Sequence, residues 1–412
     1  MRIMQGKPTR RAHLVVVTSL LSNAVVGAVA QIDVSSLEQR LAPSPTPASA
    51  FVPGAGGYTM FCSPSLASNA AALIVVASAF TGELDCNAAV ASSARDIVLT
   101  RSTDAGQSFA PLLVIATAAS VYGADCAACV LSDATPVGLA IDSNAPLLLF
   151  ATGAHSAAAR DAGVLDVLLW RSTDSGVTWS TMPENLTAAL GGPPMPRLAG
   201  THGIKIQNAK YAGRLAVPAT RTYGATAPAA TAFISDDSGA TWRRSAGETQ
   251  GGKHGGFAEL SWETPQPRVE PGTLVAYLQD DVTPCGTGMP PRCRWLAYSV
   301  DGGDTWGGVT ESDSDGGSGG SISQWWVGRG LLTVNARSPG GNLTLFASQD
   351  GGEGGTGNEV IAREGGSADV LNFIWLAVAE FAAVAWESPG GGVVVVVVDP
   401  STLIGALSPS QM

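Results

Sequence analysis

The segment Ser172-Thr-Asp-Ser-Gly-Val-Thr-Trp179 is the most informative part of the 412-residue chain, because close copies of it recur along the sequence. Its aspartate can accept backbone N–H bonds inside a tight turn, its glycine can adopt a positive φ, and its aromatic ring can cover the turn. Residues 166–171, which precede it, are of types that favour strands. We call the pattern Ser-x-Asp-x-Gly-x-Thr-Trp the Asp box and interpret it as a corner that joins two antiparallel strands.

The Asp box recurs at a nearly regular spacing. A fifth copy lacks the Thr-Trp end, and the aspartates of the five copies are Asp104, Asp174, Asp237, Asp301 and Asp350. Successive aspartates are 70, 63, 64 and 49 residues apart. A period of about 60 residues suits one four-stranded sheet, and roughly 360 residues of such repeats make about six sheets around a channel. We therefore predict an all-β fold, a six-bladed β-propeller with four-stranded antiparallel blades, in preference to five or seven blades.

The composition supports one large globular domain. The chain is 45% hydrophobic and 14% charged, with 50 glycines and 25 prolines, which suits many short strands joined by tight turns. Its net charge of −11 argues against nucleic acid or anionic lipid as an electrostatic partner. We also expect no cofactor and no metal.

The N-terminal segment has the pattern of a secretory signal. Four basic residues precede an apolar run over residues 14–29, which ends in small residues before a predicted cleavage after Ala30. An uncleaved membrane anchor is the alternative, and polar residues within the run disfavour it. The expected product is a monomer, secreted or retained in the lumen of the secretory pathway, without stable membrane insertion. The predicted segments are a signal peptide (1–30), a Pro/Ala/Ser-rich linker (31–50), the propeller (51–405) and a tail (406–412).

The six cysteines suit an oxidising compartment. Cys285 and Cys293 bracket a short Pro/Gly-rich stretch and are the easiest pair to bridge. The motif Cys126-Ala-Ala-Cys129 fits a local disulfide, a metal half-site or a redox pair; the sequence has no second such pair or His cluster at zinc-ligand spacing, which favours the disulfide. Cys62 and Cys86 then remain as the third pair. Sequons at Asn185 and Asn342 would be glycan acceptors in a eukaryotic secretory route.

Segments outside the Asp boxes narrow the choice of family. In order along the chain, they resemble the middle and last blades of the sialidases (neuraminidases), and the resemblance extends from about Phe51 to Leu403. The segments are Thr201-His-Gly-Ile-Lys-Ile206, Gly213-Arg-Leu-Ala-Val-Pro218, Phe257-Ala-Glu-Leu260, Gly272-Thr-Leu-Val-Ala276, Phe381-Ala-Ala-Val-Ala-Trp-Glu387 and Val393-Val-Val-Val-Val-Val398.

This resemblance implies a hydrolase that removes terminal sialic acids from glycoconjugates. Sialidases hold the substrate carboxylate with three arginines, whose planar forks suit bidentate contact. Their nucleophile is a tyrosine activated by a glutamate, and an aspartate on a loop of the first blade serves as acid and base. The partner implied for this chain is a glycan or glycoconjugate.

Three positions of this set fall in the first and last blades of this chain. Cys62, in Phe61-Cys-Ser-Pro64, stands where the family has its first clamp arginine. Glu387 matches the glutamate that supports that arginine, and Asp85 is the best match to the acid/base aspartate. An exposed loop residue is the alternative reading of Asp85.

The middle blades depart further from the family set. His254 stands at the position of the activating glutamate, five residues before Glu259, which matches a second family glutamate. A histidine there could act as a base, although a loop residue is the simpler interpretation. Gln279 occupies the position of the second clamp arginine, and Arg337 lies near that of the third. The match to the nucleophile segment, residues 367–371, contains no tyrosine.

Three functions remain open on these residues. The first is a sialidase-type hydrolase with an unrecognised site. The second is a non-catalytic propeller that binds glycan or protein on the same face. The third is a different glycosidase with two carboxylates, drawn from Asp85, Glu259 and Glu387. Because losing three charge-assisted contacts would cost on the order of 5–9 kcal/mol of substrate binding, we expect negligible ordinary sialidase catalysis.

Overall fold

The computed structural model describes most of the predicted propeller. The described residues are 47–69, 71–82, 86, 95–138, 146–207, 209–223, 228–249, 252–260, 271–280, 293–311, 319–325, 330–336, 342–348, 357–363, 371–376, 381–388 and 391–398. The predicted signal peptide and tail lie outside these residues.

Within these ranges the strands form six antiparallel sheets, five of four strands and one of five. The sheets contain, in chain order, β2 (Met60–Ser68), β3 (Leu73–Phe80), β4 (Asp96–Ser102) and β5 (Leu113–Ala116); β6 (Val130–Val137), β7 (Leu147–Ala154), β8 (Asp166–Ser172) and β9 (Glu184–Asn185); β10 (Arg197–Leu198), β11 (Ile204–Lys205), β12 (Leu215–Arg221), β13 (Ala229–Ser235) and β14 (Arg243–Arg244); β15 (Lys253–Glu259), β16 (Leu274–Asp280), β17 (Cys293–Ser299) and β18 (Gly307–Glu311); β19 (Gly319–Trp325), β20 (Gly330–Ala336), β21 (Asn342–Ser348) and β22 (Gly357–Arg363); and β23 (Leu371–Leu376), β24 (Phe381–Glu387) and β25 (Val393–Val398) with β1 (Ala48–Phe51).

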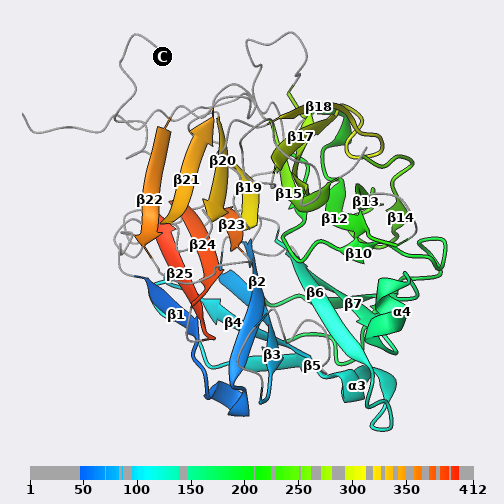
Figure 1. Ribbon diagram of the computed structural model, residues 1–412, viewed down its shortest axis with the longest axis vertical. Helices are drawn as coiled ribbons and strands as arrows, with labels where there is room; N and C mark the ends of the chain where they lie inside the picture. Colours follow the sequence, from blue (N-terminus) through cyan, green and yellow to red (C-terminus); the bar gives the residue numbers. More distant parts are fainter. Residues whose placement is uncertain are drawn as a thin grey trace, which may run out of the picture.

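The sheets follow one another around a common centre (Figure 1). Strands β2, β6, β15, β19 and β23 form inner edges, and neighbouring sheets contact one another in chain order until β23 meets β2. The last sheet contains both ends of the described chain, because β1 pairs with β25 as its outermost strand. β1 begins at Ala48, inside the segment assigned to the linker from sequence. The predicted all-β propeller arrangement of antiparallel sheets is confirmed.

The third sheet departs from the predicted four strands. Its inner edge consists of two short strands, β10 and β11, which both pair with β12. Between them the chain leaves the sheet, with Gly200 at a φ of 68°, and Gly203 forms a bridge to Val137 of the second sheet. An added Cβ on Gly203 would lie 2.6 Å from the Val137 side chain, so a glycine is needed for this approach. The inner strand is split because part of it serves the neighbouring sheet.

The helices within the described residues are short and lie in the connections between strands. They are η1 (Ala55–Gly57), α3 (Ala118–Tyr122), α4 (Ala157–Asp161) and η2 (Ala209–Tyr211). The longer two begin at hydroxyl residues, Thr117 and Ser156, whose side chains accept backbone N–H bonds of the first turn. None of the helices described is long and apolar enough to cross a membrane.

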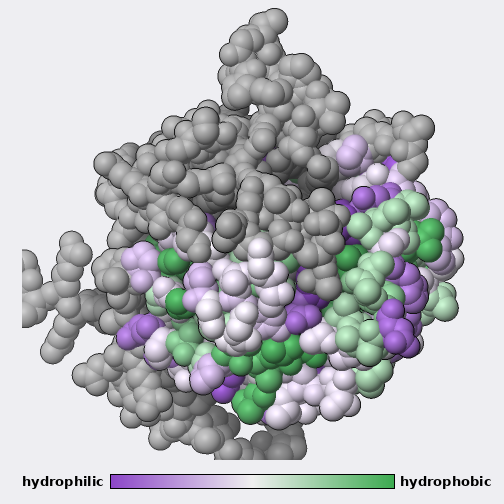
Figure 2. Space-filling view, turned by 60° about the horizontal axis from the view of Figure 1, so that its bottom comes forward, coloured by the Kyte–Doolittle hydropathy of each residue, from purple (hydrophilic) through white to green (hydrophobic). Residues whose placement is uncertain are grey.

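The hydrophobic core lies between adjacent sheets. All eight residues of β3 are buried, because one set of its side chains faces the last sheet and the alternate set faces the second. Val75 packs in a cluster with Val395, whereas Ile74 packs in a cluster with Leu149. On the surface, hydrophilic and hydrophobic residues are interspersed over the described face in Figure 2.

The four Asp boxes that the structure describes form the predicted corners. In each, the aspartate accepts bonds from the box serine and from the Ser/Thr four residues on, and the glycine N–H donates to that serine. Hydrogen bonds from Thr241 and Ser235 lower the pKa of Asp237 to about 2. Trp242 covers its box, with its indole N–H bonded to the carbonyl of Gly239. The residues of the fifth box after Ser348 lie outside the described part.

Each Asp box also packs on the sheet before it. The glycine of each of three boxes lies against a side chain of the preceding sheet, so that an added Cβ would come within about 3 Å of it. The distances from this Cβ are 2.9 Å at Gly106 to Val397, 2.7 Å at Gly176 to Ile74 and 3.0 Å at Gly239 to Leu148. The boxes therefore serve as joints between neighbouring sheets as well as corners within one sheet.

Candidate functional site

The two ends of the sheets can be told apart by their connections. In an up-and-down sheet the first-to-second and third-to-fourth connections share one end, and the second-to-third connection lies at the other. The Asp boxes join third and fourth strands, so they mark what we call the box end. We call the opposite end, where β3–β4, β7–β8, β16–β17 and β24–β25 are connected, the loop end.

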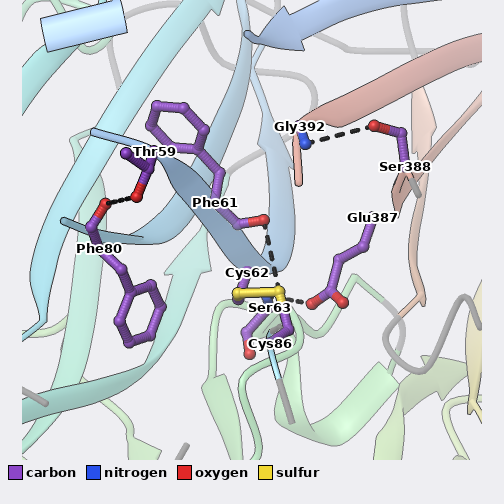
Figure 3. The surroundings of a disulfide bond; sticks show 9 residues. All are labelled: Thr59, Phe61, Cys62, Ser63, Phe80, Cys86, Glu387, Ser388 and Gly392. Carbon is purple, nitrogen blue, oxygen red and sulfur yellow. Dashed lines mark hydrogen bonds between the residues drawn. A yellow bond between two sulfur atoms is a disulfide. The ribbon is translucent and has the colours of Figure 1, made fainter. Parts of the chain in front are cut away.

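A disulfide between Cys62 and Cys86 lies at the loop end of the first sheet, as the sequence predicted. Cys62 is 1% exposed and belongs to β2, whereas Cys86 comes from the connection between β3 and β4. The two sulfur atoms and a carboxylate oxygen of Glu387 all lie within 4.8 Å of one another (Figure 3). The position matched to the first clamp arginine therefore holds a neutral cystine beside a carboxylate.

A bulge in β2 gives Glu387 a hydrogen-bond partner. The pairing of β2 with β3 shifts between Cys62 and Ser65, and Ser63 has a φ of 52°. The backbone N–H of Ser63 turns out of the ladder and donates to Glu387 Oε1 at 2.6 Å (Figure 3). Glu387 ends β24 and is only 7% exposed, so its carboxylate is held in place at the junction of the first and last sheets.

The turn after Glu387 is also attached to β2. The N–H of Phe61 donates to the carbonyl of Gly391 at 2.8 Å, and Ser388 closes the turn through bonds with Gly391 and Gly392. Two consecutive odd positions of β2, Phe61 and Ser63, thus bind the last sheet. This double attachment fixes the geometry around the disulfide.

His254 and Gln279 lie close together in the register of the fourth sheet. His254 pairs with Leu278, and the adjacent Lys253 pairs with Gln279, near the end of β16 that leads to the loop end. Glu259 lies elsewhere. It pairs with Leu274 at the β15–β16 connection, which is at the box end, and it is 3% exposed and accepts the N–H of Gln207 at 2.7 Å.

Asp85 and Arg337 lie outside the described residues. The structure therefore brings Glu387 to the disulfide that contains Cys62, puts His254 and Gln279 in one register at the same end, and separates Glu259 from Glu387 by the height of the sheets. Of the three carboxylates considered for a two-carboxylate mechanism, Glu259 and Glu387 are not a pair.

The loop end also has a charged cluster that was not predicted from the sequence. Asp133 of β6 forms a bidentate salt bridge with Arg197 of β10, with a shortest N–O distance of 2.8 Å. Burial raises the pKa of Asp133, but the charge and hydrogen bonds of Arg197 outweigh this and hold it below its ordinary value. Burial lowers the pKa of Arg95 to about 10; the charge of Asp133 opposes that shift, and Arg160 and Arg197 add to it.

One signal could have revealed this cluster. Asp133 is the fourth residue of β6, as Ser63 is of β2, and both have positive φ at a bulge in the first strand of a sheet. Aligning the first strands of successive repeats would have identified Asp133 as the counterpart of the Glu387-binding residue. Its carboxylate joins the second sheet to the third.

The second predicted disulfide, between Cys126 and Cys129, is also present. Cys285, of the predicted bridge with Cys293, lies outside the described residues.

The chemistry available around Cys62 differs from that of an arginine clamp. A cystine carries no positive charge and donates no hydrogen bond to a substrate carboxylate. Glu387 carries a carboxylate beside it, which would repel an anionic sugar at that point. The three arginines of the missed cluster are grouped with Asp133 between the first, second and third sheets.

A family model described as a BNR repeat-like domain matches residues 93–356. No curated protein matches the sequence. Among solved structures, the Hadza microbial sialidase Hz136 is 20% identical, with a TM-score of 0.68 over 87% of this chain and 69% of that chain. The leech intramolecular trans-sialidase complexed with 2,7-anhydro-Neu5Ac is 14% identical, with a TM-score of 0.64 over 87% and 71% of the two chains.

The intramolecular trans-sialidase from Ruminococcus gnavus, in complex with oseltamivir carboxylate, is also similar. It is 14% identical, with a TM-score of 0.62 over 84% of this chain and 96% of that chain. At such identities the likeness shows a shared fold.

Proposed function

Because the chain belongs to the BNR repeat-like domain family, within the sialidase superfamily, we propose that it is a sialidase-like glycan-recognition protein with little or no exo-α-sialidase turnover. Its ligand would be a terminal glycan of a glycoconjugate, bound at the loop end. The carrying observation is the Cys62–Cys86 disulfide beside Glu387, at the position matched to the first clamp arginine.

The energetic argument starts from the clamp. Each charge-assisted hydrogen bond to a carboxylate contributes roughly 1.5–3 kcal/mol. With cystine at the first clamp position and Gln279 at the second, two of these contributions are absent for an anionic sugar. Tyr298 is the last tyrosine of the sequence, so the segment matched to the nucleophile has none. Recognition then depends on hydrogen bonds and stacking rather than on charge neutralisation of a sugar carboxylate.

Exo-α-sialidase hydrolysis is the second candidate function. It is supported by the fold shared with sialidases and trans-sialidases, two of which are in complex with 2,7-anhydro-Neu5Ac and oseltamivir carboxylate. In that case Asp85 would act as acid and base, with His254 or Glu387 as further catalytic groups and Arg337 and Gln279 as substrate contacts. Turnover that disappears in Asp85→Ala would establish this candidate in place of the first.

The experiment that tests the proposed function is a glycan-array measurement on the purified protein, run beside a fluorogenic sialoside assay. We expect binding to a defined set of terminal glycans and no fluorescence release above that of buffer. Arg244→Gln, a substitution of a box-end residue that pairs with Glu248, serves as a surface control that leaves binding unchanged. Binding to none of the glycans would reject the proposal.

Four further properties belong to the same proposal. The six sheets are proposed to be six blades of one closed propeller, which is supported by the pairing of β1 with β25 and by the contact of β23 with β2.

We also propose secretion after cleavage near Ala30, N-glycosylation at the two sequons, and a monomeric state. Mass spectrometry of protein from a eukaryotic secretory host tests cleavage and glycans, and analytical ultracentrifugation tests the monomer.

A further inference from the structure

A group of sulfur and nitrogen donors lies at the loop end of the second sheet, apart from the residues assigned above. Cys126 and Cys129 come from the segment between α3 and β6, and His155 follows β7 directly. The Nδ1 atom of His155 lies 3.8 Å from the sulfur of Cys126 and 3.5 Å from the sulfur of Cys129. Two elements distant in sequence thus place one imidazole against both sulfurs of a disulfide.

These distances match those between ligands of one tetrahedral cation. With zinc–sulfur bonds of about 2.3 Å and zinc–nitrogen bonds of about 2.1 Å, neighbouring sulfur and nitrogen ligands lie about 3.6 Å apart. The two observed distances bracket this value. A Cys-x-x-Cys pair with one histidine is also a donor set that suits a thiophilic cation. The imidazole would not have to move, and only the two sulfurs would have to separate.

The surroundings of His155 hold its ring in position. The ring of Tyr122 packs on it with centroids 4.7 Å apart, and the Tyr122 hydroxyl donates to Asp166 at 2.7 Å. Gly153 leaves room for this phenol, since an added Cβ would lie 2.3 Å from the hydroxyl oxygen. Such supporting contacts fix the orientation of a ligating imidazole.

The three residues differ in their exposure to solvent. Cys129 is buried, Cys126 is half-buried and His155 is exposed. A reductant can therefore reach the disulfide from the side of Cys126, and a cation bound by the three residues would keep one position open to water. Three protein ligands with an open fourth position are a common arrangement for zinc.

We propose that Cys126, Cys129 and His155 form a redox-gated site for a thiophilic divalent cation such as Zn²⁺. The disulfide is the state that does not bind the ion, and the dithiol is the state that does. A dithiol reductant supplies two electrons and two protons, is itself converted to a disulfide, and leaves two protein thiols. Binding of the cation then releases the two thiol protons to solvent, while the neutral imidazole donates the Nδ1 lone pair.

The test uses the full-length protein and Co²⁺ as a spectroscopic substitute for Zn²⁺. The protein is reduced with a phosphine, freed of reductant without oxygen, and titrated with Co²⁺. We expect a thiolate-to-cobalt charge-transfer band that saturates at one ion per chain and disappears on addition of Zn²⁺. The untreated disulfide form gives no band, and far-ultraviolet circular dichroism reports whether the fold survives reduction.

Variants separate this site from the other cysteines. Cys126→Ser with Cys129→Ser should abolish the band although every other thiol remains, whereas Cys62→Ser with Cys86→Ser should retain it. His155→Ala should weaken Co²⁺ binding by about tenfold or more. The proposal is rejected if reduced wild-type protein shows no band, if it unfolds on reduction, or if the band persists in the Cys126/Cys129 variant. A disulfide with a purely structural role is then the conclusion.

Discussion

The backbone N–H of Ser63 donates a 2.6 Å hydrogen bond to the carboxylate of Glu387, 324 residues away in the sequence. This bond joins the first sheet to the last at the loop end. It exists because a bulge in β2 turns that N–H away from the ladder, directly beside the cysteine that forms a disulfide with Cys86. A backbone donor and a neutral disulfide thus lie beside the carboxylate that the sialidase resemblance pairs with an arginine.

Restoring the arginine should strengthen binding of a sialoside. In Cys62→Arg with Cys86→Ser, the guanidinium would lie beside Glu387 and offer a charge-assisted contact of roughly 1.5–3 kcal/mol, which is about a tenfold to hundredfold gain in affinity. Titration calorimetry with sialyllactose measures this gain. The matched control is Cys62→Ser with Cys86→Ser, which opens the disulfide without adding charge. Equal affinities of the two variants would show that this position does not contact the sugar carboxylate.

The Asp boxes should stabilise the joints between sheets. Gly176→Ala places a methyl group 2.7 Å from the Cδ1 atom of Ile74, at a φ of +82° that side chains rarely adopt. Gly191→Ala imposes similar backbone strain at a φ of +98°, but meets no atom within 4 Å. We expect Gly176→Ala to lose about 2 kcal/mol more unfolding free energy than Gly191→Ala. Urea denaturation measures both values, and equal losses would mean that the joint carries no packing energy.

The Asp-box carboxylates should make the fold sensitive to acid. Hydrogen bonds from Thr241 and Ser235 lower the folded-state pKa of Asp237 from 3.8 to about 2, and the pKa of each of the other three described box aspartates is also lowered. A lowered folded-state pKa gives stability that is present above the unfolded-state value and is lost as the pH falls through the folded-state value.

Stability should therefore decline as the pH falls from about 4 to about 2. Urea denaturation at several pH values in that window measures the decline. Asp237→Asn removes one of the four titrating groups and should flatten the slope. An identical slope in wild type and variant would contradict the assignment.

The Asp133–Arg197 salt bridge should couple the second sheet to the third. The two side chains are partly buried, 23% and 17% exposed, and removing Arg197 takes away the bidentate partner of the Asp133 carboxylate, at a cost of roughly 1–3 kcal/mol. Arg197→Met should therefore destabilise the fold more than Arg197→Met combined with Asp133→Asn. A double-mutant cycle by urea denaturation measures the coupling. Additive losses would mean that the two residues stabilise the fold independently.

The repeats made the architecture accessible from sequence. The spacing from Asp104 to Asp301 indicated sheets of similar size, and the turn chemistry of Ser, Asp and Gly at each corner is local, so one sequence suffices to recognise it. The Cys126–Cys129 disulfide was predicted correctly because the two cysteines are close in sequence, and the Cys62–Cys86 disulfide because these were the two cysteines that remained. The split inner strand of the third sheet was not foreseen, since it depends on the approach of Gly203 to Val137 in a different sheet.

The candidate site was harder to predict because its contacts join distant segments. Sequence could match Glu387 to a family position, but not its bond with Ser63, which requires a bulge in another sheet. Likewise, the sequence offered Glu259 as one of three candidate carboxylates for a two-carboxylate glycosidase, together with Asp85 and Glu387. The direction of β15 puts Glu259 at the box end, away from Glu387. The link between His155 and the two cysteines of the Cys-x-x-Cys motif is a third case, because it spans two separate loops.

The most direct test of the central claim is to follow sialyllactose by proton NMR during prolonged incubation with the purified protein. Glycan recognition without sialidase turnover predicts that the lactose-linked sugar stays intact and that no free sialic acid accumulates beyond the buffer control. Release of sialic acid in proportion to protein concentration, and its loss in Asp85→Ala, would contradict the account and establish an active hydrolase.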